Sequence, residues 1–489
     1  MTGLRKSDEA TSVAAPEISS GSIVERRSIE PVPLNERHGA SWHLGTLWFM
    51  ASAQLTTLAV GLIGPVIGAS FFTSALGMLA GTVFGTFFMA FHSAQGPRLG
   101  LPQMIQSRAQ FGYLGALVPM AVVLLVTSGF LVFDVTLFGA ALNAATGASM
   151  DTGIVICAIV ALVVAIVGYR WIHAAERWLA YLFLIFFGVL TVAAFTTIDL
   201  PEGQFTFQWM PFLALFGIAA GYQLSWAPYV SDYSRYLPPE AGHRAPFWWS
   251  YLGSALGAVW LMTLGAYLAA ASPGNDAFQG IITAGDNAFG GFGKAVLLYS
   301  LLGLVTCSTL SAYTGGLTAI TMVDSLKRID PAKWRNGVLV VFTVVATAVA
   351  MLSSEDFINN YHSFLLGLLY FLIPWTSVNL VDYYIVRRSH YAIRELFNPS
   401  GIYGVWSRNG LVSYVVGFVL MIPFFSVPGL FVGPVAESMG GADLAIFIGL
   451  PVSGLLYWAM SRNLRLDHER QVAREGDGEL QTSLPPASS

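Results

Sequence analysis

Charged residues are scarce in this chain. Only 11% of its 489 residues are Asp, Glu, Lys or Arg, whereas a soluble domain averages about 25%. Hydrophobic residues make up 55% of the chain, and the mean hydropathy is +0.63. So little charge cannot keep a chain of this length in water, and we expect lipid to be the solvent for much of it. The net charge of −4 argues against nucleic acid as a partner.

Cysteine is also scarce, and the common catalytic patterns are missing. Cys157 and Cys307 both fall in apolar runs, which excludes a disulfide framework. No zinc-type or nucleotide-type motif and no nucleophile–base pair is visible, so we expect neither an enzyme nor a bound cofactor. The first forty residues lack the apolar stretch of a signal peptide. Residues 1–40 and 464–489 are expected to be cytoplasmic tails without fixed structure, flanking one membrane domain at 41–463.

What the chain does contain is a series of long apolar segments, each able to supply the roughly 20 residues of a transmembrane helix. The twelve segments have the approximate bounds 44–69, 73–95, 114–145, 151–169, 175–197, 210–233, 246–271, 293–325, 336–352, 360–386, 409–428 and 441–460. The predicted fold class is therefore an all-α membrane protein. The Gly-rich connection at 272–291 is expected to hold a short surface helix near 277–288, as a lid or as a plain connector.

The distribution of Lys and Arg predicts the orientation. If both tails are cytoplasmic, the loops and tails on that side hold every Lys and Arg except Lys294. Basic residues are enriched in cytoplasmic loops, and one span more or fewer would scramble this partition. The sequence therefore predicts a multi-pass protein of the plasma or inner membrane, with twelve spans and both termini in the cytoplasm.

Two of the segments have the composition of interrupted helices. Residues 44–197 and 210–386 are expected to form two inverted repeats of five helices, with two further helices at 409–460. The first helix of each repeat places a Gln-Leu-hydroxyl triplet, beginning at Gln54 or Gln223, beside Gly and Pro. Gly and Pro are also common in ordinary membrane helices. The corresponding positions of the two triplets favour a break in both spans.

Polar side chains inside apolar spans are costly and are therefore candidates for a binding site. The amides of Gln54 and Gln223 complement the adjacent N–H and C=O groups of a nucleobase-like ring, or they bond a neighbouring helix. Asp134, the only acid deep inside an apolar span, suits an exocyclic amine, a coupling proton or a structural hydrogen bond. The hydroxyls of Ser308 and Thr309 suit either a hard cation or their own helix carbonyls.

Three motifs point to one family. They are Gly96-Pro-Arg-Leu-Gly-Leu-Pro-Gln103 with Ser107-Arg-Ala-Gln-Phe-Gly112, then Ser225-Trp-Ala-Pro-Tyr-Val-Ser-Asp-Tyr-Ser-Arg-Tyr236, then Asn379-Leu-Val-Asp-Tyr-Tyr384 with Arg387-Arg388. Together they resemble the first nucleobase:cation symporter family, the permeases for cytosine, purines, uracil, allantoin, thiamine and hydantoins. The resemblance covers roughly residues 35–460, and the second motif resembles the purine–cytosine branch.

The resemblance implies a LeuT-type fold of two inverted five-helix repeats plus two helices. It places the substrate between broken spans 1 and 6 and spans 3 and 8, with Gln54 as a ligand of the substrate. It also implies a sodium site formed by the carbonyls of Met50, Ala53 and Val305 and the hydroxyls of Ser308 and Thr309. Retention of both hydroxyls favours Na+ over H+ as the coupling ion.

The chain also departs from the family pattern of the hydantoin transporters, which stack the ring on two tryptophans. Leu131 and Gln223 stand in those two places. The span 8 asparagine of those transporters is replaced by Thr314 or, with a small shift in alignment, by Ser311. The remaining candidates for stacking are Phe133, Tyr222 and Trp226. This pattern favours a purine or pyrimidine over a hydantoin.

The predicted function is import of a nucleobase or related heterocycle by a monomeric secondary transporter, through cation-coupled alternating access. The predicted substrate site comprises Gln54, Asp134, Tyr222, Gln223, Trp226, Ser311 and Thr314. Two alternatives remain. One is a carrier of another substrate class, such as amino acids, on the same fold. The other is a channel or sensor without coupled transport.

Overall fold

The computed structural model describes residues 30–480 except 168–169, 273–276, 328, 354–356, 428 and 479. Nearly all of its elements are helices. Those of the first half are α1 (Trp42–Ser52), α2 (Leu55–Val66), α3 (Phe71–Ser93), α4 (Gly96–Leu99), α5 (Gln103–Gln106), α6 (Arg108–Phe111), α7 (Leu117–Thr146), α8 (Met150–Val167) and α9 (Arg170–Thr197). Those of the second half are α10 (Trp209–Leu224), α11 (Ala227–Ser234), α12 (Arg244–Ala271), α13 (Ala277–Ala288), α14 (Phe292–Leu326), α15 (Pro331–Ser353), α16 (Phe357–Val381), α17 (Arg408–Met421), α18 (Pro434–Ser438), α19 (Ala445–Ser461) and α20 (Leu466–Gly476).

Each of the twelve expected apolar segments falls on one of these helices or on a pair of them. Among the described residues, eight helices are long and apolar enough to cross a membrane, and up to ten if each sharply bent pair is counted as one span. The other expected segments include two shorter apolar helices, Tyr181–Thr197 and Arg408–Phe424. The expected surface helix near 277–288 is confirmed as α13. A two-stranded hairpin of β1 (Ser426–Val427) and β2 (Phe431–Val432) precedes α18.

The first span is interrupted at the Gln-Leu-hydroxyl triplet, as the sequence predicts, but Gly61, Gly64 and Pro65 lie inside the intact helix α2 and not at the break. Helix α1 ends at Ser52, Gln54 has an extended backbone (φ −152°, ψ 170°), and α2 starts at Leu55 after a bend of 52°. In the sixth segment, α10 and α11 are separated by a turn at Ser225 and Trp226, and the span continues without a sharp bend. The two interruptions therefore lie at the two Gln-Leu-hydroxyl triplets but differ in sharpness.

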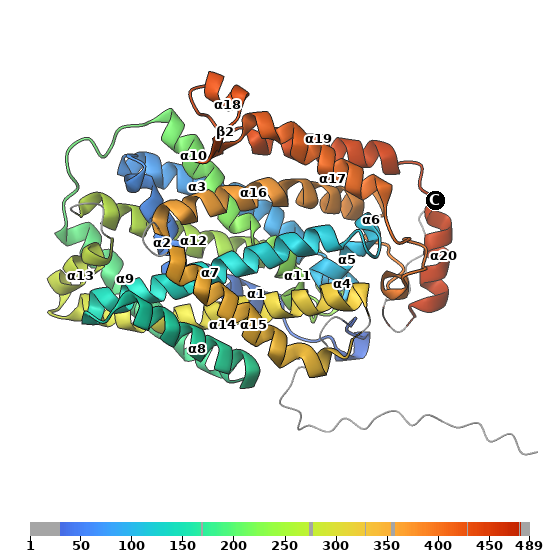
Figure 1. Ribbon diagram of the computed structural model, residues 1–489, viewed down its shortest axis with the longest axis horizontal. Coiled ribbons are helices and arrows are strands. Elements are labelled where there is room, and N and C mark those ends of the chain that lie inside the picture. Colours follow the sequence, from blue (N-terminus) through green and yellow to red (C-terminus); the bar gives the residue numbers. More distant parts are fainter. Residues whose placement is uncertain are drawn as a thin grey trace, which may run out of the picture.

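The helices pack as two sets, which meet at the site described below. The first helix set consists of α1, α2, α3, α10, α11 and α12, and the second of α7, α8, α14 and α15; each packs mainly within itself. Helix α16 contacts both sets and also α19, which packs on α17. In Figure 1, α7, α14 and α15 lie side by side below α16, while α19 runs above it and α18 stands at the top.

Glycines permit the close packing of the first helix set. A Cβ on Gly81 of α3 would lie 2.2 Å from the carbonyl oxygen of Phe216 in α10, and one on Gly61 of α2 would lie 2.1 Å from that of Met262 in α12. Gly253 of α12 makes an equally close approach to Gly45 of α1. Backbones this close leave no room for side chains, so these helices are held as one body.

The polar segments expected to be tails are partly folded. In residues 30–40, the Val32 N–H donates to the Gly100 carbonyl at 2.9 Å, and Arg37 donates to the carbonyls of Pro97 and Leu480. Burial lowers the pKa of Arg37 to about 10, with Glu240 opposing that shift, so the guanidinium stays charged at neutral pH. Residues 1–29 lie outside the described part of the chain.

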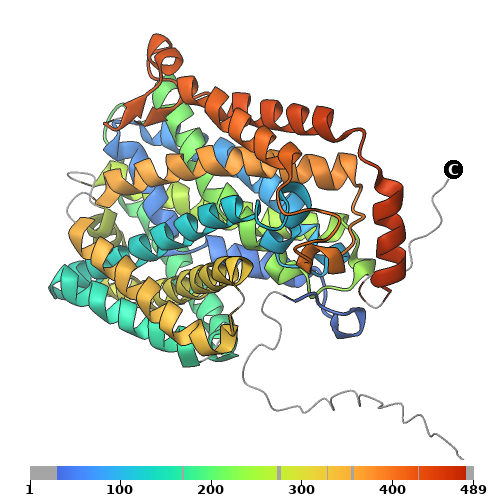
Figure 2. The ribbon, with the colours of Figure 1, turned by 45° about the vertical axis from the view of Figure 1, so that its right-hand side comes forward.

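The expectation of an unstructured segment at 464–489 is wrong for α20. This helix packs against the end of the bundle, called here the tail end, where residues 30–40 also lie (Figure 2). Its Glu469 accepts from Arg387 Nε at 3.0 Å and from the hydroxyl of Tyr403 at 2.7 Å. The composition of this segment does not predict a helix, because its few inward-facing residues are outnumbered by charged ones. Tertiary contacts are needed to stabilise it.

Candidate functional site

The break in the first span holds Gln54 at the boundary between the two helix sets. Its Nε2 donates to the Ala51 carbonyl at 2.8 Å, and its Oε1 accepts a hydrogen bond from Cys307 Sγ of α14. The amide thus satisfies one carbonyl that the end of α1 leaves without a helical partner. Gln54 therefore stands where the sequence predicts, beside the eighth segment.

Asp134 lies on α7, next to the broken first span, and is 2% exposed. It projects from α7, and its Oδ1 accepts from Thr56 Oγ1 of α2 at 2.7 Å. Thr57, the next residue, shares a hydrogen bond of 2.6 Å with the hydroxyl of Tyr222 in α10. The two threonines after Gln54 thereby connect the broken span to α7 and to α10.

These side chains line one small cavity. It is bounded by Gln54, Thr56, Thr127, Phe130, Asp134, Tyr222, Trp226, Tyr229, Cys307, Leu310, Ser311 and Thr314. Six of the seven predicted substrate residues are among them. The free volume is about 30 Å³, which admits water but not a heterocyclic ring. Such a ring would fit only if the two helix sets were further apart.

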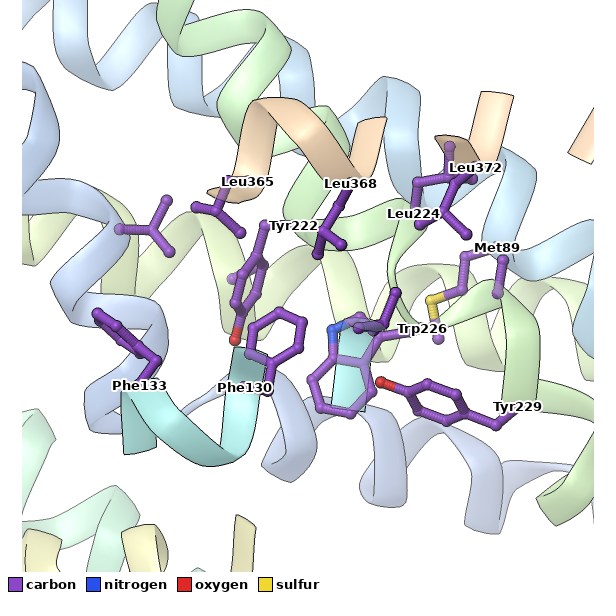
Figure 3. Close-up of a cluster of buried hydrophobic side chains, with 14 of the residues drawn as sticks. Met89, Phe130, Phe133, Tyr222, Leu224, Trp226, Tyr229, Leu365, Leu368 and Leu372 are labelled. Carbon is purple, nitrogen blue, oxygen red and sulfur yellow. The ribbon is translucent and has the colours of Figure 1, made fainter. Parts of the chain in front are cut away.

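Aromatic side chains form one wall of the cavity. The rings of Phe130 and Trp226 are nearly parallel, at 23°, with centroids 6.5 Å apart, close to the roughly 7 Å that a ring stacked between two others requires. Figure 3 shows Tyr222, Phe130, Trp226 and Tyr229 in a row. Phe133 is set apart from them and stacks on Tyr361 with centroids 3.3 Å apart. Phe133, expected as a candidate for stacking, therefore does not line the cavity in this arrangement, whereas Phe130 does.

Gln223 does not line the cavity, contrary to the prediction. Its Nε2 donates to Thr86 Oγ1 of α3 at 2.6 Å and to Ser254 Oγ of α12 at 2.9 Å. It is fully buried within the first helix set. The reason is the close packing of α10 on α3, which fixes the rotation of α10 and turns this position away from α7 and α14.

A larger hollow of about 240 Å³, the vestibule, lies between this cavity and the tail end. It shares Tyr229, Leu310 and Thr314 with the cavity. Its other lining residues come from α11 and the residues after it on one side and from α14 and α7 on the other, with α5 and Pro102 beside them. The space between the two helix sets is thus wider toward the tail end than at Gln54.

The oxygen atoms predicted to bind a cation lie at the break and on the adjoining turn of α14. Among the described hydrogen bonds, none is donated to the carbonyls of Met50 and Ala53. On α14, Thr309 Oγ1 donates to the Val305 carbonyl at 2.7 Å, and Ser308 Oγ lies 3.5 Å from Cys157 Sγ. Ser308 and Thr309 are buried, and the contact of Cys307 with Gln54 brings this turn against the break. The donor set is entirely oxygen, as a hard cation requires.

The comparison with protein families decides what kind of protein this is. A sequence profile described as "Permease for cytosine/purines, uracil, thiamine, allantoin" matches residues 31–449. The chain belongs to this family. The resemblance drawn from the three motifs is therefore confirmed. A relative from Bacillus subtilis, the putative purine-cytosine permease YxlA, is 34% identical over 90% of this chain and 96% of its own length.

More distant permeases extend the family across kingdoms. The purine-cytosine permease fcyB of Emericella nidulans is 26% identical over 89% of this chain and 87% of its own. Among solved structures, the inward-facing conformation of Mhp1 is similar with a TM-score of 0.70 and 19% identity, covering 91% of this chain and 94% of that one. A closed conformation of Mhp1 with bromovinylhydantoin bound gives 0.68 and 18%, covering 94% and 98%. At such identities the structures establish the fold of the permease and nothing beyond it.

Six residues of the cavity were missed by the sequence reasoning, namely Thr56, Thr127, Phe130, Tyr229, Cys307 and Leu310. Thr56 belongs to the Gln54 triplet, and Phe130 lies four residues before Asp134 and so on the same helix face. Both could have been found from those spacings. Cys307 and Tyr229 carry no comparable signal, because only the packing of α14 and α11 turns them toward the break.

Proposed function

We propose that this permease imports a nucleobase or related heterocycle by cation-coupled alternating access, with Na+ as the coupling ion. The observation that carries the proposal is the cavity between the two helix sets, which Gln54 and Asp134 line together with the nearly parallel rings of Phe130 and Trp226. A planar heterocycle can stack on such rings while its edge atoms bond the amide and the carboxylate. The relatives named as purine-cytosine permeases support the same substrate class.

The vestibule supports an inward-open state. In this state, substrate leaves past Tyr229 and Thr314 toward the tail end, which the distribution of Lys and Arg assigns to the cytoplasm. Import then requires the first helix set to rock against the second, closing the vestibule and opening the opposite side. The close glycine contacts within the first set let it move as one body.

The proposed architecture is twelve spans built on two inverted five-helix repeats, acting as a monomer in the cell membrane. The contacts between helices support the repeat. In such a repeat, spans 1 to 4 correspond to spans 6 to 9. Helix α1 of span 1 packs on α12 of span 7, and the corresponding helices, α10 of span 6 and α3 of span 2, also pack on each other. Likewise, α7 of span 3 packs on α8 of span 4, and the corresponding helices of spans 8 and 9, α14 and α15, also pack on each other. Such a pattern is typical of repeats related by a two-fold axis.

Sodium is supported by the oxygen donors at the break. The carbonyls of Met50 and Ala53, which accept no described hydrogen bond, and the buried hydroxyls of Ser308 and Thr309 together offer a site between the two helix sets. A cation there favours one arrangement of the sets, and substrate favours the same arrangement, so binding of each strengthens the other.

A thermal-shift panel tests substrate and ion together. Purified protein is heated with cytosine, adenine, uracil, allantoin or leucine, in sodium or potassium chloride. A ligand that binds the folded state raises the melting temperature. We expect a shift with an amine-bearing base that is larger in sodium. Equal shifts in both salts would overturn the assignment of Na+, and a shift with leucine alone would identify an amino-acid carrier.

Counterflow in proteoliposomes tests the transport mode. A carrier preloaded with unlabelled base accumulates labelled base transiently, because it exchanges one for the other, whereas a channel does not. Accumulation is expected with the base selected by the thermal-shift panel. Its absence in protein that binds the base would overturn the carrier and identify a channel or sensor.

A further inference from the structure

Two hydrogen bonds cross the cavity from one helix set to the other. Thr56 of the first set donates to Asp134 of the second at 2.7 Å. In the opposite sense, Cys307 of the second set donates through Sγ to Gln54 of the first. All four side chains line the cavity. The boundary between the two sets is thus bridged by the very groups proposed to hold the substrate.

Each bridge occupies an atom that a substrate would use. Gln54 accepts from Cys307 and donates to Ala51, so both ends of its amide are engaged. Asp134 has one carboxylate oxygen engaged by Thr56. Gln54 and Asp134 are 7% and 2% exposed, so bulk water has little access to them. A buried acceptor without a partner bears its full desolvation cost.

We propose that Cys307 and Thr56 take the place of the substrate when the carrier is empty, and thereby set how fast the empty carrier changes conformation. The proposal rests on the function proposed above. An importing carrier must return empty, so its site has to close around Gln54 and Asp134 with no ligand present. The two hydrogen bonds satisfy these groups during that step. When a base enters, its edge atoms displace Cys307 and Thr56, which are positioning residues acting through Gln54 and Asp134.

Comparing net uptake with exchange isolates this role. Net uptake of radiolabelled cytosine into proteoliposomes requires the empty carrier to return, whereas exchange against internal cytosine does not. In Cys307→Ala and Thr56→Val, one buried acceptor loses its partner only in the empty carrier. Net uptake is therefore expected to fall about fivefold or more relative to exchange.

Matched variants separate this effect from damage to the fold. Cys307→Ser and Thr56→Ser keep a donor and should restore the wild-type ratio. Thr306→Ala and Thr136→Val remove hydroxyls that, within the described part of the chain, donate to the carbonyls of Leu302 and Val132 in their own helices, so the ratio should not change. An equal loss of uptake and exchange in Cys307→Ala and Thr56→Val, or no rescue by serine, would overturn the proposal. Absence of exchange in the wild-type protein would instead overturn the function on which it rests.

Thiol labelling provides a readout that does not depend on transport. Cys157 is fully buried and Cys307 lines the cavity, and the chain has no other cysteine. In Cys157→Ser protein, a small methanethiosulfonate reagent is expected to label Cys307 more slowly when cytosine is bound. An unchanged labelling rate at a cytosine concentration that saturates the thermal shift would place Cys307 away from the substrate and overturn the proposal.

Discussion

Asp134 projects from the middle of α7 toward the broken first span, with Thr56 on one of its oxygens. At this position a carboxylate can accept a hydrogen bond from the exocyclic amine of cytosine or adenine. Asp134→Asn keeps the shape and removes the charge. Because hydrogen bonds to charged groups contribute about 1.5–3 kcal/mol, the Kd for an aminated base should rise roughly 10- to 100-fold.

The measurement is a titration of the thermal shift with cytosine or adenine in sodium chloride. Uracil lacks the exocyclic amine and is the matched ligand, whose affinity should change much less. Equal weakening of cytosine and uracil would mean that Asp134 does not contact the amine. Unchanged affinity for both would assign Asp134 a structural role alone.

The two glutamines of the repeated triplet have separate roles in the structure. Gln54 lines the cavity, whereas Gln223 ties α10 to Thr86 and Ser254 within the first helix set. Each variant removes two hydrogen bonds of a buried amide, so both should lower the melting temperature, by an amount that corresponds to about 1–3 kcal/mol. Gln54→Ala should also weaken cytosine binding, whereas Gln223→Ala should leave the affinity for cytosine unchanged. Comparable loss of affinity in both variants would return Gln223 to the substrate site.

At the scale of elements, α20 is held to the bundle by a buried ion-pair network. Arg387, 7% exposed in its side chain, pairs with Glu469 of α20 at 3.0 Å and also with Asp382. The hydroxyls of Tyr391 and Tyr457 donate to Asp382 at 2.7 and 2.8 Å. Removal of one partner from such a partly desolvated pair strongly destabilises the fold, because the other charge stays buried without compensation. The network therefore fixes the C-terminal helix to the end of α16.

Glu469→Ala should release α20 and lower the melting temperature of the whole protein. It deprives Arg387 and Tyr403 of a buried acceptor, which costs about 1–3 kcal/mol. Asp467→Ala is the matched control on the same helix, since Asp467 is fully exposed and pairs with Arg470 at 3.7 Å. Proteolysis of α20 should accelerate in the first variant only. Identical melting curves for the two variants would contradict the proposed docking of α20.

At the scale of the whole molecule, the vestibule is expected to open to the side of the membrane that carries the termini. Thr318 lines the vestibule, whereas Ser438 lies exposed on α18 beyond the hairpin. In a background of Cys157→Ser and Cys307→Ser, a membrane-impermeant thiol reagent should reach Thr318→Cys only from the side of the termini. Ser438→Cys should react only from the other side. Labelling of both from one side would overturn the proposed orientation.

The sequence by itself determined the helices and much of the site. Hydropathy locates the apolar segments because a buried backbone must form its hydrogen bonds within each segment in lipid. The triplet that starts at Gln54 marks the position of the break, although Gly61, Gly64 and Pro65, which suggested an interrupted helix, lie inside the intact helix α2. Gln54 and Asp134 could therefore be assigned to the site, since a polar group in an apolar span is expensive wherever the span packs.

Only the tertiary structure decided which way the helices turn and which distant residues meet. Gln223 faces α3 because glycines let α10 approach that helix closely. Nothing in the triplet itself predicts how α10 is rotated about its axis. Helix α20 is polar in composition and folds only against Arg387 and its neighbours. The pairs Thr56–Asp134 and Gln54–Cys307 join residues 78 and 253 positions apart. Such contacts arise from how the two helix sets pack, and periodicity and local composition do not encode them.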